Sequence, residues 1–347
     1  MKFLSSLGNQ TRKKQMKIIV PMAGRGSRLR PHTLTIPKPL MPVAGKPIVQ
    51  RLVEDIAAVS DEPIDEIAFI IGDFGIETEN QLKNIAKSIG AKGSVYHQEE
   101  ALGTAHAILC AQESLEGNVV VAFADTLFRA DFKLNTEDDG IIWVNQIDNP
   151  SAFGVVKLDN EGTITDFVEK PKEFVSDLAI IGIYYFKDGE YLKNELQYLI
   201  DQNIRENGEY QITNALENMK QKGAKFKTGK VNAWMDCGNK NVTVETNQRV
   251  LDFIGENVIE GNYNSVNSVI IEPCFIGKNV TLINSIVGPH VSLGNNTTIE
   301  NSVIQNSIVQ NESSIKNGNM TNSMIGNKVS YQGKPQDLSI GDYTEIN

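Results

Sequence analysis

The chain has 347 residues, of which 40% are hydrophobic and 22% are charged, a balance typical of a soluble globular protein. That length exceeds a typical single core, so we expect two domains. The net charge of −10 and the pI near 5.1 argue against nucleic acid or an anionic membrane surface as the main partner. No apolar run approaches the roughly 20 residues that span a bilayer, so no membrane partner is expected.

The three cysteines show neither paired spacing nor a metal-binding pattern with histidine. We therefore expect Cys110, Cys237 and Cys274 to be buried thiols in a reducing cytoplasm. Before the first strand, which begins at Met16, the only hydrophobic pair is Phe3-Leu4, too short for a secretory segment. Residues 1–15 are predicted to be a disordered extension or a start placed too early.

Strand-like apolar runs alternate with helical patterns from Met16 to about Cys237. This alternation predicts an α/β doubly wound sheet, with ligands at the carboxyl ends of its strands. The run at 118–124 is almost entirely apolar, as expected for a central strand covered on both faces. Strands are expected at 18–20, 67–71, 94–97 and 118–124, and helices at 48–59, 77–89 and 103–112.

The remainder of the chain divides into a hairpin, a helix and a repeat. Residues 154–167 alternate with period two around Asn160-Glu-Gly162, which predicts a β-hairpin. Residues 241–253 have a helical pattern and would connect two domains. After about Gly261, aliphatic residues recur roughly every sixth position among asparagines and serines, which is typical of a β-helix. The predicted domains are 16–240 and 261–347, joined by 241–260.

A glycine-containing segment follows the first strand: Pro21-Met-Ala-Gly-Arg-Gly-Ser-Arg-Leu-Arg-Pro31. Without a Cβ, Gly24 and Gly26 let backbone N–H groups approach a ligand closely. The neighbouring arginines offer planar forks that suit phosphate oxygens. The segment alone is equally consistent with a plain tight turn. Its chemistry favours a loop that binds phosphate.

Taken in order, these segments resemble the sugar-1-phosphate nucleotidylyltransferases, a family of glucose-1-phosphate thymidylyl-, uridylyl- and adenylyltransferases and mannose-1-phosphate guanylyltransferases. The glycine segment and Ile36-Pro-Lys-Pro-Leu40 resemble the family signature, with Ser27 where threonine is commoner and Ala23 in place of a first glycine. The resemblance covers nearly all of 16–347. It implies a Rossmann-like doubly wound mixed sheet, carrying the catalytic site, followed by a left-handed parallel β-helix of hexapeptide repeats.

The resemblance also implies roles for individual residues at the nucleotide. Arg28 would hold the triphosphate, and Lys38 would lie at the α-phosphate. Gln98 and the segment Leu102-Gly-Thr-Ala-His-Ala107 resemble the part of the family that recognises the base. His106 falls inside a helical turn, so we expect it to be structural. The implied nucleotide-binding residues are Ala23, Gly24, Gly26, Ser27, Gln98, Gly103 and Thr104.

Two aspartates occupy the positions of the family's metal ligands. Asp125 follows the apolar strand in Phe123-Ala-Asp125, with alanine where the family more often has glycine, and Asp236 lies in Trp234-Met-Asp236-Cys-Gly238. Two carboxylates suit Mg²⁺, which completes its shell with phosphate oxygens and water. The resemblance therefore implies Mg²⁺ as cofactor.

The sugar-phosphate half of the family's site resembles Phe153-Gly154-Val and Val168-Glu169-Lys170-Pro171. Gly154 would contact the sugar through its backbone, Glu169 would accept hydroxyl groups, and Lys170 would bind the sugar phosphate. An exposed pair at a hairpin edge is the alternative for Glu169 and Lys170. Residues 208–213 also match a family segment at the sugar pocket, with roles left open.

The implied reaction converts an NTP and a sugar-1-phosphate into an NDP-sugar and pyrophosphate, and we favour glucose-1-phosphate with dTTP or UTP. The alternatives are a mannose-1-phosphate guanylyltransferase, a bifunctional enzyme whose β-helix transfers an acyl group with His290 as base, and a non-catalytic regulatory subunit. A cytoplasmic homo-oligomer, dimer or tetramer, is expected. The implied catalytic residues are Arg28, Lys38, Asp125, Lys170 and Asp236.

Overall fold

The computed structural model describes residues 15–130, 134–334, 337, 339–341 and 343–345. The extension predicted over 1–15 therefore lies outside the described residues, except for Gln15. Contacts divide the chain into two compact units, which are described separately. The first comprises Met1–Arg25, Pro37–Pro39 and Ile48–Met235, and the second Gly26–Ile36, Leu40–Pro47 and Asp236–Asn347. In the described part of the chain, no helix has the length and apolar character needed to cross a membrane.

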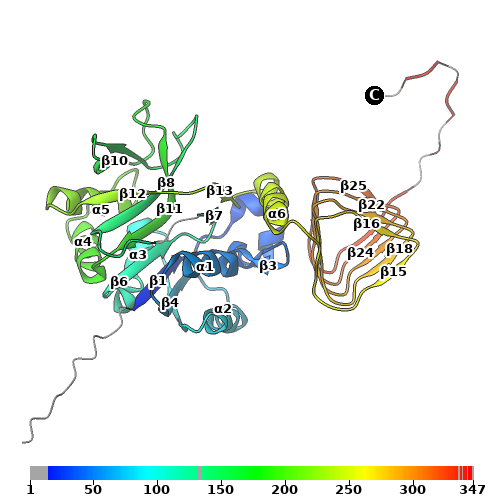
Figure 1. Cartoon of the computed structure of the whole chain (residues 1–347), viewed down its shortest axis with the longest axis horizontal. Helices are drawn as coiled ribbons and strands as arrows, with labels where there is room; N and C mark the ends of the chain where they lie inside the picture. Colours follow the sequence, from blue (N-terminus) through cyan, green and yellow to red (C-terminus); the bar gives the residue numbers. More distant parts are fainter. Residues whose placement is uncertain (1–14, 131–133, 335–336, 338, 342, 346–347) are drawn as a thin grey trace, which may run out of the picture. The chain divides into compact units, whose positions relative to one another are not determined.

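The first unit is built on a mixed sheet with strand order β10-β9-β11-β6-β1-β4-β5, in which β8 pairs with β11 and β12 (Figure 1). Strands β4, β1 and β6 run parallel, as do β4 and β5, whereas β11 is antiparallel to both β6 and β8. The predicted Rossmann-like mixed sheet is confirmed. The strands are β1 (Met16–Pro21), β4 (Ile64–Ile71), β5 (Lys92–His97), β6 (Asn118–Ala122), β8 (Gly140–Gln146), β9 (Val155–Leu158), β10 (Ile164–Val168), β11 (Leu178–Phe186) and β12 (Phe226–Lys230).

Helices of the first unit bury one apolar side each, as their spacing predicts. In α1, for example, Ile48, Leu52 and Ile56 are buried. The helices expected at 48–59 and 77–89 are confirmed, and the one expected at 103–112 ends early, at Leu109, before a short 3-10 turn. The helices are α1 (Ile48–Val59), α2 (Ile76–Ser88), α3 (Thr104–Leu109), α4 (Gly189–Asp201) and α5 (Ile212–Gln221).

Two short pairings complete the first unit. Strands β9 and β10 form the predicted antiparallel hairpin, and the Asp159 carboxylate accepts the N–H groups of Glu161 and Thr163 in its turn. Strand β7 (Thr126–Arg129) pairs with β13 (Ala233–Asp236). Next to this pair, the Asn232 N–H donates to the Arg129 carbonyl at 2.7 Å.

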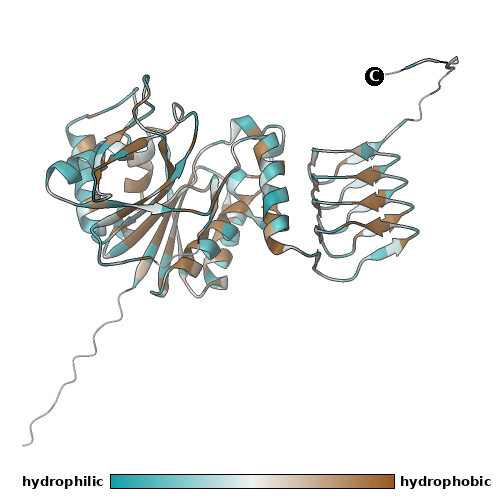
Figure 2. Ribbon diagram, turned by 45° about the horizontal axis from the view of Figure 1, so that its top comes forward, coloured by the Kyte–Doolittle hydropathy of each residue, from teal (hydrophilic) through white to brown (hydrophobic). Residues whose placement is uncertain are grey.

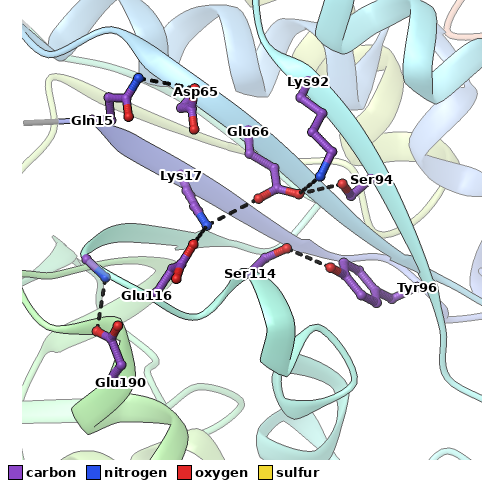
Figure 3. Close-up of polar contacts among 11 residues, drawn as sticks. Gln15, Lys17, Asp65, Glu66, Lys92, Ser94, Tyr96, Ser114, Glu116 and Glu190 are labelled. Carbon is purple, nitrogen blue, oxygen red and sulfur yellow. Dashed lines mark hydrogen bonds and ion pairs between the residues drawn. The ribbon is translucent and has the colours of Figure 1, made fainter.

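A cluster of charges lies across the amino ends of the central strands (Figure 3). Lys17 on β1 approaches Glu66 on β4 at 3.3 Å and Glu116 at 2.5 Å. Lys92 on β5 is 3.1 Å from Glu66, which also accepts the Ser94 hydroxyl. The predicted ligand site belongs to the opposite edge of the sheet, where the strands have their carboxyl ends.

The second unit contains a long helix and a β-hairpin. Helix α6 (Lys240–Ile254) confirms the helix predicted over 241–253; it begins where the Asn239 side chain accepts two backbone N–H groups and ends at Gly255, which has φ 77°. This is the usual chemistry of a helix start and a helix stop. The hairpin joins β2 (Pro42–Val43) to β3 (Lys46–Pro47).

Residues 258–332 of the second unit form the predicted left-handed parallel β-helix. Its strands fall into three parallel sheets, and each residue pairs with one 16 or 17 positions later, as in Thr281, Thr298 and Ser314. Buried aliphatic residues fill the inside, and apolar strands recur along the coil in Figure 2. The three sheets are β14 (Val258–Ile259), β17 (Cys274–Ile276), β20 (Val291–Leu293), β23 (Ser307–Val309) and β26 (Met324–Ile325); β15 (Asn264–Val266), β18 (Thr281–Ile283), β21 (Thr298–Glu300), β24 (Ser314–Lys316) and β27 (Ser330–Gln332); and β16 (Val269–Ile270), β19 (Ile286–Val287), β22 (Val303–Ile304) and β25 (Asn319–Met320).

Candidate active site

A lysine and an aspartate from separate segments meet in the first unit. Asp125 lies three residues beyond the end of central strand β6, and Lys38 begins a 3-10 turn between two prolines. The Lys38 Nζ is 3.0 Å from the Asp125 Oδ2. The Lys38 side chain is 13% exposed, whereas that of Asp125 is 41% exposed. The carboxylate is thus held by an almost buried ammonium group and remains accessible to a ligand.

The glycine segment begins at the carboxyl end of β1. The Met22 N–H donates to the Ile70 carbonyl at 2.8 Å, which continues the β1–β4 pairing to the last residue before Ala23. Gly24 is exposed, and a Cβ placed on it would have no heavy atom within 4 Å. The space beside this backbone is open, as a close approach by phosphate oxygens requires.

The expected base-recognition residues lie together after β5. The Gln98 Nε2 donates to the Gly103 carbonyl at 3.5 Å and to the His106 Nδ1 at 3.1 Å. Gly103 has φ 116°, and a Cβ there would lie 2.4 Å from the Tyr210 carbonyl oxygen, so this position requires glycine. Thr104 faces the same neighbouring segment, because its hydroxyl donates to the Gln211 Oε1 and accepts the Ile212 N–H.

The expected sugar-phosphate residues also gather in the first unit. A Cβ on Gly154 would lie 3.2 Å from the Glu169 Oε2 and 3.2 Å from the Thr213 Cγ2. The Thr213 hydroxyl donates to the Glu169 Oε2 at 3.2 Å, and the Lys170 Nζ is 3.5 Å from the Glu169 Oε1. The Glu169 side chain is 11% exposed, while that of Lys170 is half exposed. An oriented carboxylate and an accessible ammonium group are therefore presented together.

The backbone at Lys170 has an unusual conformation. Its φ is 39°, a value that residues with a Cβ seldom adopt. The Lys170 N–H donates to the Phe153 carbonyl at 3.1 Å, and the Phe153 ring packs edge-on against Trp234 at 5.1 Å between centroids. Strained backbone of this kind persists where the surroundings hold it, and it is concentrated at functional sites.

The second unit contains the remaining signature residues. Gly26 has φ 59° and precedes the 3-10 turn Ser27–Leu29, in which Ser27 and Arg28 are exposed. A Cβ on Gly238 would lie 3.0 Å from both carboxylate oxygens of Asp236 and 3.4 Å from the Arg28 Nη2. Glycine at 238 therefore leaves room for an aspartate carboxylate and an arginine guanidinium side by side.

Thr213 and His106 make side-chain contacts that the sequence did not predict. Thr213 orients Glu169, and His106 accepts the Gln98 amide. The only sequence signal for Thr213 was its place in the segment 208–213. His106 was expected to be structural, but its contact with Gln98 was not predicted, because the two residues lie eight positions apart on separate segments.

Among the described residues, no cluster of three or more His, Cys, Asp or Glu side chains could bind a metal ion by itself. Mg²⁺ commonly takes only one or two carboxylates, with phosphate and water completing its shell. The accessible Asp125 carboxylate fits such an oxygen donor.

The model of the family described as "Nucleotidyl transferase" matches residues 17–252. A "Glucose-1-phosphate thymidylyltransferase" of Streptomyces antibioticus is 32% identical over 340 residues, covering 90% of this chain and 93% of the relative. The chain belongs to the sugar-1-phosphate nucleotidyltransferases. It is an enzyme that transfers a nucleotidyl group to a sugar-1-phosphate.

Other relatives of this nucleotidyltransferase support the same assignment. A "Low-salt glycan biosynthesis nucleotidyltransferase" of Haloferax volcanii is 31% identical, covering 90% of this chain and 92% of the relative. A "Bifunctional protein GlmU" of Methanocaldococcus jannaschii is 33% identical, covering 74% of this chain and 60% of that protein. The solved structure of a UDP-glucose pyrophosphorylase complexed with UDP-glucose matches with a TM-score of 0.56 and 25% identity, covering 68% of this chain and 98% of that one.

Proposed function

We propose that the enzyme joins dTTP or UTP to glucose-1-phosphate, releasing pyrophosphate. The relatives named for thymidylyl transfer to glucose-1-phosphate cover 90% and 95% of this chain, which supports glucose as the sugar and thymine as one base. The fold match to a UDP-glucose pyrophosphorylase supports uracil as the other base.

The observation that carries the proposal is the 3.0 Å pair between the Lys38 Nζ and the Asp125 Oδ2 at the carboxyl end of β6. Ligands of doubly wound sheets bind at this edge, where strand ends deliver their side chains. A nearly buried ammonium beside an accessible carboxylate gives one site that attracts both a phosphate and a cation. Nucleotidyl transfer needs this combination at the α-phosphate.

The nucleophile of the proposed reaction is an anionic phosphate oxygen of the sugar-1-phosphate, so the chain does not need to supply a general base. The barrier comes from bringing two anions together, which positioning and positive charge reduce. Lys38 would bind the α-phosphate, Lys170 the sugar phosphate, and Arg28 the departing pyrophosphate. Ala23, Gly24, Gly26 and Ser27 would hold the phosphate chain through their backbone and the serine hydroxyl.

We propose Asp125 and Asp236 as the carboxylates that bind Mg²⁺. When bound, the ion would supply positive charge to phosphate oxygens. Asp125 is accessible, with a side chain that is 41% exposed, as a ligand to a bound ion must be. Glycine at 238 leaves the Asp236 carboxylate room beside the Arg28 guanidinium.

Glu169 is proposed to select the sugar. Its carboxylate is oriented by the Thr213 hydroxyl at 3.2 Å, so it can accept hydrogen bonds from sugar hydroxyls in a fixed direction. Gly154 carries no side chain that would occupy this space. Its backbone would contact the sugar.

The rival functions meet specific obstacles. For acyl transfer, only the Nδ1 of His290 could act as base, because the Nε2 is 2.6 Å from the Asp252 Oδ1. A non-catalytic subunit would usually lack one of the charged site residues, and every one of them is present. Guanylyl transfer to mannose-1-phosphate stays the nearest alternative, because Gln98 and Gly103 could also face a purine.

We also propose that the enzyme is a cytoplasmic homo-oligomer. Its three cysteines show no paired spacing along the chain, which suits a reducing compartment. Val269, Ile286 and Val303 lie in register on one sheet of the β-helix and are exposed. An exposed aliphatic row of this kind favours self-association.

A substrate matrix tests the proposal. The enzyme with Mg²⁺ would be incubated with each of dTTP, UTP, GTP, ATP and CTP against the 1-phosphates of glucose, mannose, galactose and N-acetylglucosamine, and pyrophosphate release measured. We expect the fastest turnover with glucose-1-phosphate and dTTP or UTP. Fastest turnover of GTP with mannose-1-phosphate would support the alternative pair, and no turnover with any pair the regulatory subunit. Thiol release from acetyl-CoA would reveal an acyltransferase.

A further inference from the structure

The Gln98 side chain is held in one orientation. Its Nε2 donates to the Gly103 carbonyl at 3.5 Å and to the His106 Nδ1 at 3.1 Å. A carbonyl oxygen only accepts hydrogen bonds, so the edge of the Gln98 amide that faces Gly103 must be the NH₂ group. In the described part of the chain, the Gln98 Oε1 makes no hydrogen bond, and the residue is half-buried. The carboxamide thus has an occupied donor side and a free acceptor.

His106 accepts this amide as a neutral imidazole. Burial lowers its pKa below the ordinary value, against the opposing effects of the Glu100 charge and of a hydrogen bond to the Glu100 backbone. A neutral imidazole has one N–H donor and one acceptor nitrogen. The Gln98 Nε2 can only donate, so the His106 Nδ1 is the acceptor and the ring proton lies on Nε2. In this tautomer His106 adds the shorter of the two bonds that hold the Gln98 amide in that direction.

The Gly103 carbonyl is equally fixed. The Tyr210 N–H donates to the Leu102 carbonyl at 2.8 Å, and the Ala105 N–H donates to the Tyr210 carbonyl at 2.9 Å. Gly103 lies between these bonds, where a Cβ would meet the Tyr210 backbone at 2.4 Å. Because both acceptors for the Gln98 amide are rigid, the side chain cannot turn over without losing both bonds.

We propose that His106 is a positioning residue that keeps the Gln98 oxygen directed at the base, so that the site selects bases presenting an N–H donor at that point. This inference rests on the proposed function and on Gln98 as a base-contacting residue. Uracil and thymine offer the imide N3–H, whereas cytosine places an acceptor at N3. Two facing acceptors leave both groups without a partner, a mismatch that polar sites reject strongly.

The test compares UTP with CTP, which share ribose and triphosphate and differ only in the base. Two ratios are measured. The first is kcat/KM for UTP divided by kcat/KM for CTP, with glucose-1-phosphate as the other substrate. The second does not depend on turnover and is the equilibrium affinity for UDP divided by that for CDP, determined by calorimetry. We expect the wild-type ratio to favour uracil by about 10²-fold or more. His106→Phe keeps a ring but removes the acceptor, and we expect its ratio to fall about tenfold or more because Gln98 can then turn over.

Two further variants distinguish a positioning role of His106 from a purely structural one. His106→Asn retains an acceptor oxygen near the Nδ1 position and should keep the ratio within about threefold of wild type. His97→Phe makes the same replacement at a half-exposed histidine whose Nε2 faces Glu79, and it should leave the ratio unchanged. The inference would be overturned if the wild-type enzyme preferred cytosine. It would also be overturned if folded His106→Phe had the same uracil-to-cytosine ratio as the wild type. If no turnover were found but the UDP/CDP affinity ratios of the wild type and the variants were as expected, the proposed reaction would be contradicted. The role of His106 would still be supported.

Discussion

The segments of the first unit that are proposed to bind substrates and the β-helix of the second unit use polar residues in opposite ways. In the β-helix, asparagines recur at corners with positive φ, and Asn267, Asn284 and Asn301 donate side chain to side chain along the coil. Asparagine tolerates this conformation better than most residues, so each corner is locally favourable. In the segments expected to bind substrates, a positive φ also occurs at Lys170, a residue type without such tolerance.

This difference shows where function is concentrated. A repeated contact has several equivalents, so the loss of one has a local and small effect. The pair of Lys38 with Asp125 and the bond of Thr213 to Glu169 each occur once. We therefore expect single substitutions to have large effects where contacts are unique and chemically directed, and small effects where they are repeated.

The largest effect is expected at the phosphate site. Lys38→Ala or Asp125→Asn should lower pyrophosphate release by about 10²–10³ while leaving the fold intact, because each removes one preorganised charge. Lys87→Ala, which removes an exposed lysine from α2, is the matched control and should keep wild-type turnover. Circular dichroism and thermal unfolding would check the fold. If Lys38→Ala or Asp125→Asn kept half the wild-type rate, the site assignment would be wrong.

A second comparison lies within the second unit, between a unique asparagine and a repeated one. Asn247 on α6 is fully buried, and its Oδ1 accepts the Ala44 N–H at 2.9 Å and the Ser292 hydroxyl at 2.7 Å. Asn247→Ala removes one acceptor from two buried donors, and we expect a loss of about 2–4 kcal/mol in the free energy of unfolding.

The matched control is Asn284→Ala, at an exposed corner of the β-helix. It should cost about 1 kcal/mol, mainly from the left-handed backbone conformation. Urea unfolding of both variants measures the difference. Equal losses would contradict the distinction between unique and repeated contacts.

The charge cluster of Figure 3 is also a set of unique contacts, but it lies at the amino ends of the strands, opposite the edge predicted to bind ligands. It therefore tests whether a unique contact must also be a functional one. Burial by itself raises the pKa of Glu66, but hydrogen bonds from Ser94 and Lys92 and the charge of Lys17 outweigh it and lower the pKa below its ordinary value. A lowered folded-state pKa contributes stability above the unfolded pKa, and this stability is lost as pH falls through the folded pKa.

Glu66→Gln should therefore cost about 1–2 kcal/mol of unfolding free energy at pH 7 and progressively less in acid, where wild-type Glu66 becomes protonated. Turnover at pH 7 should not change. Denaturant unfolding at pH 7 and pH 4, with exposed Glu113→Gln as control, measures the effect. A difference that grew toward acid pH would have the wrong sign for this account.

Much of the fold follows from the sequence, because local pattern and final environment agree. The helix predicted over 48–59 is α1, the hairpin around Gly162 forms, and the hexads build the β-helix. The direction of β11 could not be predicted in the same way. Its apolar run fits a buried strand in either orientation, and only its neighbours make it antiparallel to β6 and β8.

The site residues that come directly after strands could be predicted from the sequence. Asp125 and Gln98 come shortly after β6 and β5, so the predicted strands placed them at one edge. Contacts over long separations were not accessible from pattern. The Ala44 N–H meets Asn247 from 203 positions away, and the Gln310 amide meets the Met41 sulfur from 269 positions away. Such pairs depend on how the whole chain packs.

Product analysis tests the central claim most directly. The enzyme would be incubated with Mg²⁺, glucose-1-phosphate and dTTP or UTP, and the products followed by phosphorus NMR. We predict that a nucleoside diphosphate sugar and pyrophosphate form in equal amounts, and only when both substrates are present. Pyrophosphate release at the same rate without glucose-1-phosphate, or no nucleotide sugar with any tested sugar-1-phosphate, would contradict the account.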